Sequence, residues 1–329
     1  MTLLGTVQML LLAGCLFGIL TSVACSITTP HLVRWTATWA PASRHRALVL
    51  LAFAPWMLSL AGLCSVMLPS LLGTLWPAHD HCLVHAGHSH LCLMHPSHHV
   101  GAWTGWALIT GVGAWLTTQL MLGALVLLRA SRVVRELSRH ARYDAARALW
   151  IVPSDEVLCV SVGLLRPRLM VSDGLLDTAP IQGIEIMSAH EEAHIRRKDS
   201  LVRLLVRAAT VPLMPDARRT LRATLELCAE QACDEHAAAN AGDRLRVAET
   251  ILAVERRLDA ASGLRCSPLV AAFGSSFVPE RVEAMLQPVR EAGACARLVG
   301  VLGVMVAVVL GAYEPLHHAT ESLLSVFSH

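Results

Sequence analysis

Residues 190–194 read His-Glu-Glu-Ala-His, a pattern that can bind a metal ion and use it in hydrolysis. Helix positions four residues apart share one face, so the imidazoles of His190 and His194 can take neighbouring corners of a zinc tetrahedron. Glu191 lies beside them, where it can act as general base toward a water on the open position of the metal. The alternative is that two solvated histidines lie on a charged helix.

A catalytic zinc ion held by two histidines needs a third protein ligand. Residues 230–234 read Glu-Gln-Ala-Cys-Asp and belong to a strongly helical stretch, 217–241, that contains no Gly or Pro. We predict Glu230 as the third ligand, presented by a second helix antiparallel to the first. Asp234 lies one turn further on and could accept a hydrogen bond from a ligating histidine. Two other carboxylates remain alternatives to Glu230, those of Glu226 and Glu235.

The elements around these motifs can be predicted from periodicity. Apolar and motif residues form one helical stripe from Ile184 to His194, and the stretch 184–211 lacks Gly and Pro. Residues 132–149 are basic with apolar side chains at helical spacing, which predicts a helix. Two short strands are predicted, Val157–Val162 and Leu169–Val171, separated by Gly163 and Pro167. From about Ile181 onward the chain is expected to be mainly helical.

Composition places the chain in a membrane. Hydrophobic residues make up 54% of the 329 residues and charged residues only 16%, with a mean hydropathy of +0.52. Four apolar stretches contain no Lys, Arg, Asp or Glu and approach the roughly 20 residues that a membrane span requires. They run over 3–29, 47–76, 102–128 and 298–313, the last being the shortest. The net charge of +2 gives no reason to expect direct contact with nucleic acid.

Basic residues predict the orientation of these spans. Of the 27 Lys and Arg residues, three lie at positions 34–46 and all others between Arg129 and Arg297. The positive-inside rule then places residues 130–296 in the cytoplasm and both termini outside. The alternative for the first span, a cleaved signal peptide, is disfavoured because the span lacks a basic start and is too long.

The predicted outer loop, residues 77–101, is rich in histidine. Imidazoles in such number could bind a transition metal, and we expect the loop to sense one, although a polar loop with incidental metal affinity is an equal alternative. Cys82 and Cys92 could form a disulfide in an oxidising compartment or could be further metal ligands. The histidines are His79, His81, His85, His88, His90, His95, His98 and His99.

Four motifs, in order, resemble the BlaR/MecR-type integral membrane zinc metallopeptidases, relatives of the HtpX and CAAX-prenyl-protease group. The resemblance covers about residues 100–290 and implies a gluzincin-type site with His190, His194 and Glu230 as zinc ligands and Glu191 as base. It also implies a cytoplasmic α+β protease domain between the third and fourth spans. The motifs are Gly163-Leu-Leu-Arg-Pro167, Ser172-Asp-Gly-Leu-Leu176, His190-Glu-Glu-Ala-His-Ile-Arg-Arg-Lys-Asp199 and Glu230-Gln-Ala-Cys-Asp234.

One departure from this family bears on its function. BlaR/MecR sensors carry a penicillin-binding domain after the last span, whereas residues 314–329 contain no Ser-x-x-Lys. β-Lactam sensing by acylation is therefore not expected. The expected organisation is a mainly α-helical membrane protein with three spans and the His-rich loop in 1–129, the protease domain in 130–296, and a fourth span with a short outer tail in 297–329.

The expected function is that of a regulatory zinc endopeptidase in a bacterial inner membrane. Its substrate would be a cytoplasmic or membrane-proximal protein, and the resemblance suggests a transcriptional repressor. A non-catalytic metal-sensing scaffold is the main alternative. A transporter is disfavoured because the spans contain no charged residue. Tyr143 and His236 are possible partners for an oxyanion.

Overall fold

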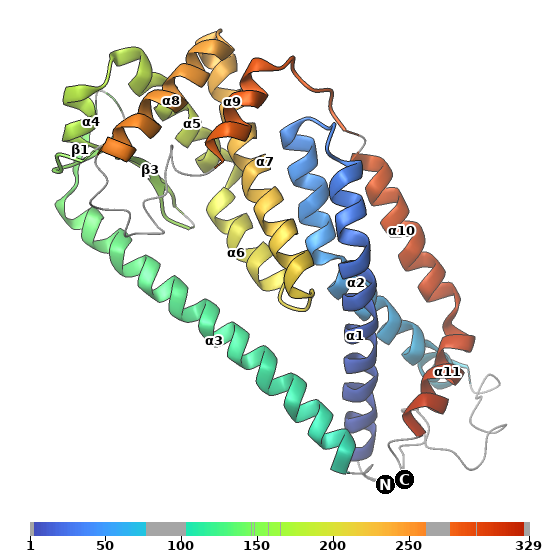
Figure 1. Cartoon of the computed structure of the whole chain (residues 1–329). Helices are drawn as coiled ribbons and strands as arrows, with labels where there is room; N and C mark the ends of the chain where they lie inside the picture. The colour runs from blue at the N-terminus through green and yellow to red at the C-terminus, as the bar shows by residue number, and fades with distance from the viewer. Residues whose placement is uncertain are drawn as a thin grey trace.

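The computed structural model describes residues 3–76, 103–260 apart from 146, 148, 157 and 165, and 277–325 apart from 294. Long helices fill one end of the molecule and a mixed α/β region fills the other (Figure 1). The predicted His-rich loop, 77–101, lies outside the described residues, and so do Cys82 and Cys92.

Three helices are long and apolar enough to cross a membrane: α1 (Leu3–Trp35), α2 (Pro41–Leu75) and α3 (Trp103–His140). A fourth crossing is possible if α10 (Cys295–Gly311) and α11 (Tyr313–Ser325) count as one broken span, since they are bent by 68°. The chain is therefore a membrane-associated protein with three or four such helices among the described residues. The three longer predicted spans correspond to α1, α2 and α3, although residues 76 and 102 lie outside these helices.

Residues 313–325, which begin at the end of the predicted fourth span and include most of the predicted tail, form helix α11. This helix folds back against α2, and the buried ring of His317 makes a 2.7 Å hydrogen bond through Nδ1 with the Val66 carbonyl. The predicted boundary at residue 313 therefore marks a bend in the helical path rather than its end.

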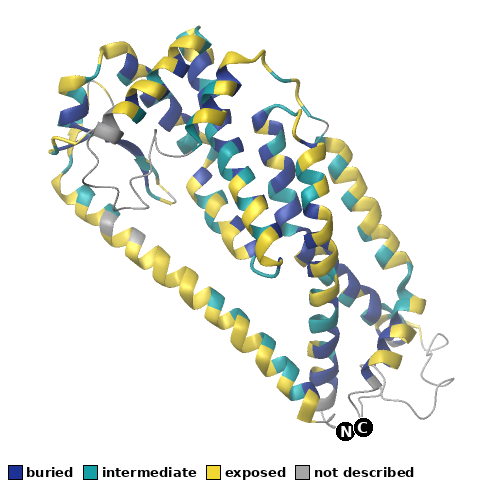
Figure 2. Cartoon of the chain, viewed as in Figure 1, coloured by how far each residue is buried: buried dark blue, intermediate teal, exposed yellow. Residues whose placement is uncertain are grey.

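Helices α1 and α2 form the centre of the membrane end, and α10 packs against α2. By contrast, α3 contacts α1 near its start and then runs apart from the bundle (Figure 1). Figure 2 shows that α3 is exposed along most of its length. Its exposed side chains include Leu120, Met121 and Leu122. Such a surface is expected where a helix faces lipid.

A four-stranded sheet follows α3 directly, in the order β1-β2-β4-β3. Its strands are β1 (Arg142–Asp144), β2 (Leu149–Val152), β3 (Cys159–Val162) and β4 (Arg168–Ser172). The central strands β2 and β4 are parallel, and the other two pairs are antiparallel. The two predicted strands are confirmed as β3 and β4.

The helix predicted over 132–149 is wrong beyond His140, where the chain turns into β1 and β2. The segment Leu149–Val152 is apolar and rich in β-branched and aromatic side chains, and it is largely buried between β1 and β4. Hydrogen bonding to the neighbouring strands and burial in the sheet therefore determine the conformation of this segment. They outweigh the helical tendency of the alanines that precede Leu149.

The domain is completed by helices α4 (Asp173–Thr178), α5 (Ile181–Arg197), α6 (Asp199–Ala209), α7 (Pro215–Ala241), α8 (Arg244–Ala260) and α9 (Val278–Leu286). Their apolar faces enclose a core between the sheet and helices α5, α7, α8 and α9, with Val171, Leu175 and Ile251 fully buried. The break between α5 and α6 lies at Lys198, which adopts a left-handed conformation with φ of 55°.

Candidate metal centre

Helices α5 and α7 bring His190, His194 and Glu230 together in one cluster. The Nε2 atoms of the two imidazoles lie 3.1 Å apart. The Glu230 carboxylate oxygens lie 3.4 Å from His190 Nε2 and 3.6 Å from His194 Nε2. Ligands about 2.0–2.1 Å from a tetrahedral metal are separated by about 3.3–3.4 Å. The three predicted ligand atoms therefore have the spacing of a metal-binding face.

Charge around the cluster also fits a divalent cation. Four carboxylates surround it, from Glu191, Asp199, Glu230 and Asp234, all buried or half-buried. Among the residues that the structure describes, two guanidinium groups pair with them: Arg281, with Asp234 and Glu230, and Arg197, with Asp199. Within this described set, the four carboxylates carry two more formal charges than the two guanidinium groups when both imidazoles are neutral. Buried charge of this kind requires a counter-charge, and a divalent metal ion would supply both positive charges.

The same imbalance affects the titration of the ligands. Burial lowers the pKa of His190, but hydrogen bonds to Asp234 and Glu230 outweigh burial, and the pKa lies above its ordinary value. Burial raises the pKa of Glu230, yet its hydrogen bonds with both histidines hold that pKa well below the ordinary value. The first shift favours the protonated form of His190, and the second favours the ionised form of Glu230 beside it.

Each candidate histidine ligand is oriented by a carboxylate. His190 Nδ1 lies 2.9 Å from Asp234 Oδ1, and His194 Nδ1 lies 2.8 Å from Asp199 Oδ2. With Nδ1–H donating to the carboxylate, each ring presents the lone pair of Nε2 to the centre. Asp234 occupies the place expected from sequence.

The role of Asp199 was not anticipated from the sequence. Asp199 reaches His194 because the left-handed residue Lys198 ends α5 and starts α6 in a new direction. Without that turn, a position five residues after His194 would not share its helical face. The absence of Gly and Pro gave no sign of the break.

Arg281 is the second residue that sequence reasoning missed. It comes from α9, is 1% exposed, and donates to Asp234 through Nε at 2.8 Å and Nη2 at 2.6 Å. Its Nη1 lies 3.4 Å from Glu230 Oε2. This pairing holds together the carboxylate that orients His190 and the carboxylate proposed to bind metal. The sequence offers no signal for a contact across 47 positions.

Glu191 faces the sheet beside the cluster. Its side chain is 3% exposed, and Oε2 accepts a 2.7 Å hydrogen bond from the Ser161 backbone N–H on β3. β3 is an edge strand of the described sheet. Because the Ser161 N–H donates to Glu191, this N–H points away from β4. The outer edge of β3 therefore faces the candidate centre.

A second group of ligand-type atoms shares His194 with the first and adds Asp199 and Cys233. The buried Cys233 sulfur lies 3.8 Å from Asp199 Oδ2. Burial raises the pKa of Cys233 to about 11, so the thiol keeps its proton at neutral pH and can donate to Asp199. The first group has two half-buried members, His194 and Glu230, and the second has one, His194.

The remaining candidates lie elsewhere. Glu235 pairs with Arg244, and Glu226 lines a hollow beside α6, so neither alternative to Glu230 joins the cluster. Tyr143 lies on β1, at the opposite edge of the sheet from β3. His236 contacts Arg196 and Asn240 on an exposed surface. Neither possible oxyanion partner is brought into the cluster.

No family model, no curated protein and no solved structure matches the chain. The resemblance to BlaR/MecR-type metallopeptidases therefore rests on the sequence motifs alone.

Proposed function

We propose that this chain is a membrane-bound, zinc-dependent endopeptidase of the gluzincin type. The observation that supports this best is the convergence of His190, His194 and Glu230 beside a carboxylate, Glu191, that faces an edge strand. A purely structural metal site is normally closed by four protein ligands. Three ligands and a neighbouring base leave one position for a water, as a hydrolytic site requires.

Zinc bound by these ligands would acidify a water molecule and polarise the carbonyl of the bond to be cut. The protein residues supply the rest of the chemistry. Glu191 would accept the proton of the attacking water and pass it to the leaving amine. The hydrogen bond from Ser161 to Oε2 orients this carboxylate before substrate arrives. Asp234 and Asp199 hold the two imidazoles in the tautomer that binds metal.

The outer edge of β3 offers a place for an extended peptide. Leu158 and Ser172 hydrogen-bond each other across β3 and β4, and pairing alternates along an antiparallel ladder. The backbone groups of Cys159 and Ser161 therefore point outward. A substrate added along this edge would pass Glu191, as expected for an endopeptidase that cuts within a chain.

The position of the cluster relative to the end of the α2 span supports a substrate close to the membrane. Asp199, which contacts His194, lines one hollow together with His45 in the second turn of α2. Arg44 and Arg46 lie at the same end of α2, where its apolar stretch begins. The centre thus lies level with the end of a span, and the distribution of basic residues favours the cytoplasmic side of a bacterial inner membrane. A transcriptional repressor is one substrate that the motif resemblance suggests.

The test is a Glu191→Gln variant of the full chain, compared with Glu192→Gln. Glu192 is exposed on the same helix and provides a matched control. Each protein would be reconstituted in lipid and incubated with a proteome-derived peptide library, and mass spectrometry would count new termini. We expect Glu191→Gln to keep its zinc and to lose about 10²–10⁴-fold or more in cleavage, because an amide cannot accept the proton.

Two results would contradict the proposal. Cleavage by Glu191→Gln at the parent rate would exclude Glu191 as the base. Zinc binding without any cleavage by the parent, even with a candidate repressor added, would favour the non-catalytic scaffold.

A further inference from the structure

The α6–α7 hairpin, residues 199–229, lies against the membrane helices rather than over the sheet (Figure 1). Its tip is tied to α1, where Ser22 donates to the Pro212 carbonyl and the Met214 N–H donates to Ser26 Oγ at 2.9 Å. Trp56 of α2 donates to the Ala209 carbonyl at 2.8 Å. These partners lie inside the apolar stretches of α1 and α2, so the tip lies at membrane depth.

The rise per residue of a helix gives the depth of the hairpin's arginines relative to the charged ends of α1 and α2. Ser26 lies about 12 Å along α1 from Arg34, the charged residue at the end of that span. On the hairpin, Arg222 lies about 12 Å from Met214, the partner of Ser26. Arg222 therefore returns to the level of Arg34.

Arg203, on the other arm of the hairpin, lies about 6 Å deeper than Arg46. Trp56 lies about 15 Å along α2 from Arg46. Arg203 lies about 9 Å along α6 from Ala209, the partner of Trp56. Arg207 starts lower, but its long side chain can reach toward the surface. Arg203 and Arg222 are thus near the boundary between lipid and water, where headgroups lie, and the Arg207 side chain extends toward it from below.

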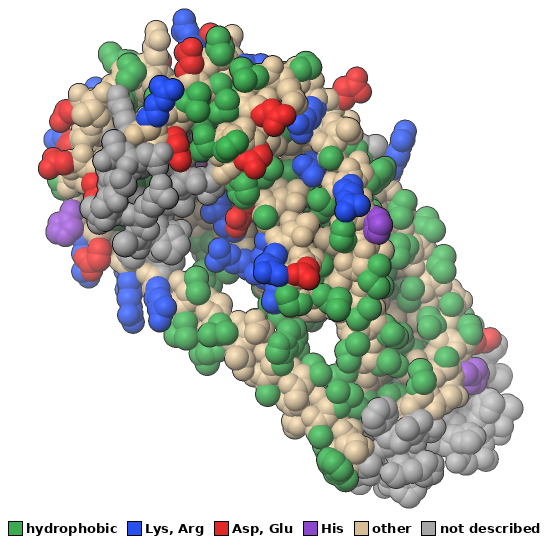
Figure 3. Space-filling view, viewed as in Figure 1, with side chains coloured by type: hydrophobic (Ala, Val, Ile, Leu, Met, Phe, Trp, Pro, Cys, Tyr) green, Lys and Arg blue, Asp and Glu red, His purple; other side chains and the backbone are tan. Residues whose placement is uncertain are grey.

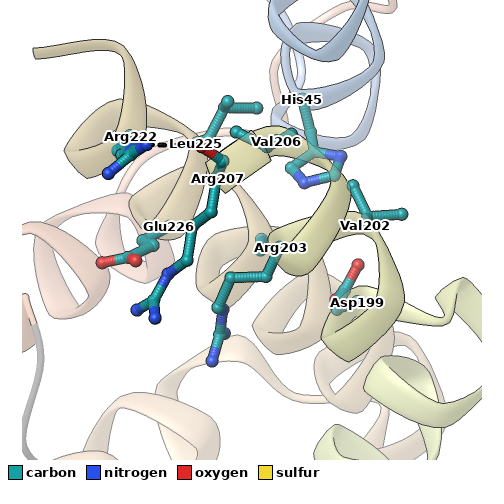
Figure 4. A pocket seen from close by; sticks show the side chains of 10 residues that line it. His45, Asp199, Val202, Arg203, Val206, Arg207, Arg222, Leu225 and Glu226 are labelled. Atoms are coloured by element: carbon teal, nitrogen blue, oxygen red, sulfur yellow. Dashed lines mark hydrogen bonds between the residues drawn. The ribbon is translucent and has the colours of Figure 1, made fainter. Parts of the chain in front are cut away.

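These arginines line the hollow between α2, α6 and α7 (Figure 4). The guanidinium groups of Arg203 and Arg207 point in the same direction in that view. Figure 3 shows Lys and Arg side chains gathered over α6 and α7. The other residues of the hollow are His45, Asp199, Val202, Val206, Arg222, Leu225, Glu226 and Ala229.

Positive charge in the hollow exceeds the negative charge that faces it. Asp199 is already paired with His194 and Arg197, which leaves Glu226 as the other carboxylate. Arg222 is held by Thr210 Oγ1 at 2.8 Å and by the Arg207 carbonyl at 2.6 Å. Neither Arg203 nor Arg207 has a side-chain hydrogen bond or ion pair with a residue that the structure describes. Burial and the charges of Arg218 and Arg207 lower the pKa of Arg222, a sign of crowded positive charge.

We propose that Arg203 and Arg207, with Arg222 behind them, bind the phosphate of an anionic phospholipid in the adjoining leaflet. Arginine pairs suit phosphate because each guanidinium offers several donors in one plane. The hairpin tip lies against the apolar stretches of α1 and α2, and Met214 at that tip is 52% exposed, so acyl chains would surround the hairpin below the arginines. A free phosphate would use the arginines but would make no contact with this apolar tip. The bound lipid would hold the hairpin at the interface, and this inference does not depend on catalysis.

The test measures lipid binding by the full chain in detergent micelles with native mass spectrometry. Phosphatidylglycerol is titrated against the parent and against an Arg203→Gln/Arg207→Gln variant. Each arginine near an anionic lipid contributes about fivefold in affinity, so the double variant should bind at least tenfold more weakly. The matched control is Arg246→Gln/Arg256→Gln, which removes two exposed arginines of α8 and should bind like the parent.

Further arms of the experiment separate the sources of the anion. Diacylglycerol, which lacks the phosphate, should bind the parent far more weakly than phosphatidylglycerol. Inorganic phosphate should bind weakly too, and binding as tight as that of the lipid would make the ligand a soluble anion. An Arg203→Lys/Arg207→Lys variant keeps the charge but loses the planar donors, so its affinity should lie between those of the parent and the Gln pair. The proposal is overturned if the Gln pair binds like the parent, or if the Lys pair or the α8 control loses as much as the Gln pair.

Discussion

The candidate metal centre and the arginine hollow share Asp199, but the charged side chains of the centre are buried or half-buried and paired, whereas Arg203 and Arg207 in the hollow are exposed. In the centre, Asp234 is buried and is held by both His190 and Arg281. In the hollow, Arg203 and Arg207 are exposed and extend from the surface. A buried charge requires a partner within the folded protein, whereas water solvates an exposed charge until a ligand binds it. The first region should therefore be sensitive to substitution through stability, and the second through binding.

The largest expected effect is on stability, from Arg281→Leu. This change leaves the carboxylates of Asp234 and Glu230 without their guanidinium partner in a buried site. Breaking a buried ion pair in this way costs about 3–5 kcal/mol in the free energy of unfolding. Thermal unfolding of the full chain in one detergent would measure it. Arg256→Leu, at an exposed position of α8, should change stability by about 0.5 kcal/mol or less. Equal losses of stability in Arg281→Leu and Arg256→Leu would show that the buried ion pairs of the centre do not stabilise the fold more than an exposed arginine does.

A second prediction concerns metal affinity. Asp199→Asn keeps the size of the side chain but weakens the hydrogen bond that orients His194. Loss of such a partner typically lowers metal affinity by about 10–100-fold. Competition with a chromophoric zinc chelator would measure this, in a chain whose loop histidines at 79–99 are replaced by Asn. Asp177→Asn, an exposed position on α4, is the matched control. Unchanged affinity in Asp199→Asn would mean that His194 is oriented by other contacts.

The smallest expected effect lies at the hairpin tip. Ser26→Ala removes the acceptor of the Met214 N–H where the tip contacts α1. The cost should be about 1 kcal/mol in the free energy of unfolding. Thr28→Ala, two residues away on an exposed face and bonded only within α1, should cost about 0.5 kcal/mol or less. If both variants unfold together, the tip is not held at this position on α1.

The sequence predicted the parts of the centre that depend on helical spacing. His190 and His194 are one turn apart, and Glu230 and Asp234 share a helical face, so each pair could be placed from the chain alone. Arg281 could not, because its approach depends on how α9 packs against α7, a tertiary contact without local pattern. Strands β1 and β2 were missed for a related reason, since pairing with β4 decides their conformation.

The most direct test of the metal centre is zinc K-edge X-ray absorption on the full chain with its loop histidines replaced by Asn. We expect about one zinc per chain, with nitrogen and oxygen ligands at about 2.0–2.2 Å, two of them imidazole. In a Glu230→Gln variant, zinc should be held more weakly and the spectrum should change. A sulfur ligand at about 2.3 Å would contradict the account, because it would place the metal on Cys233 instead.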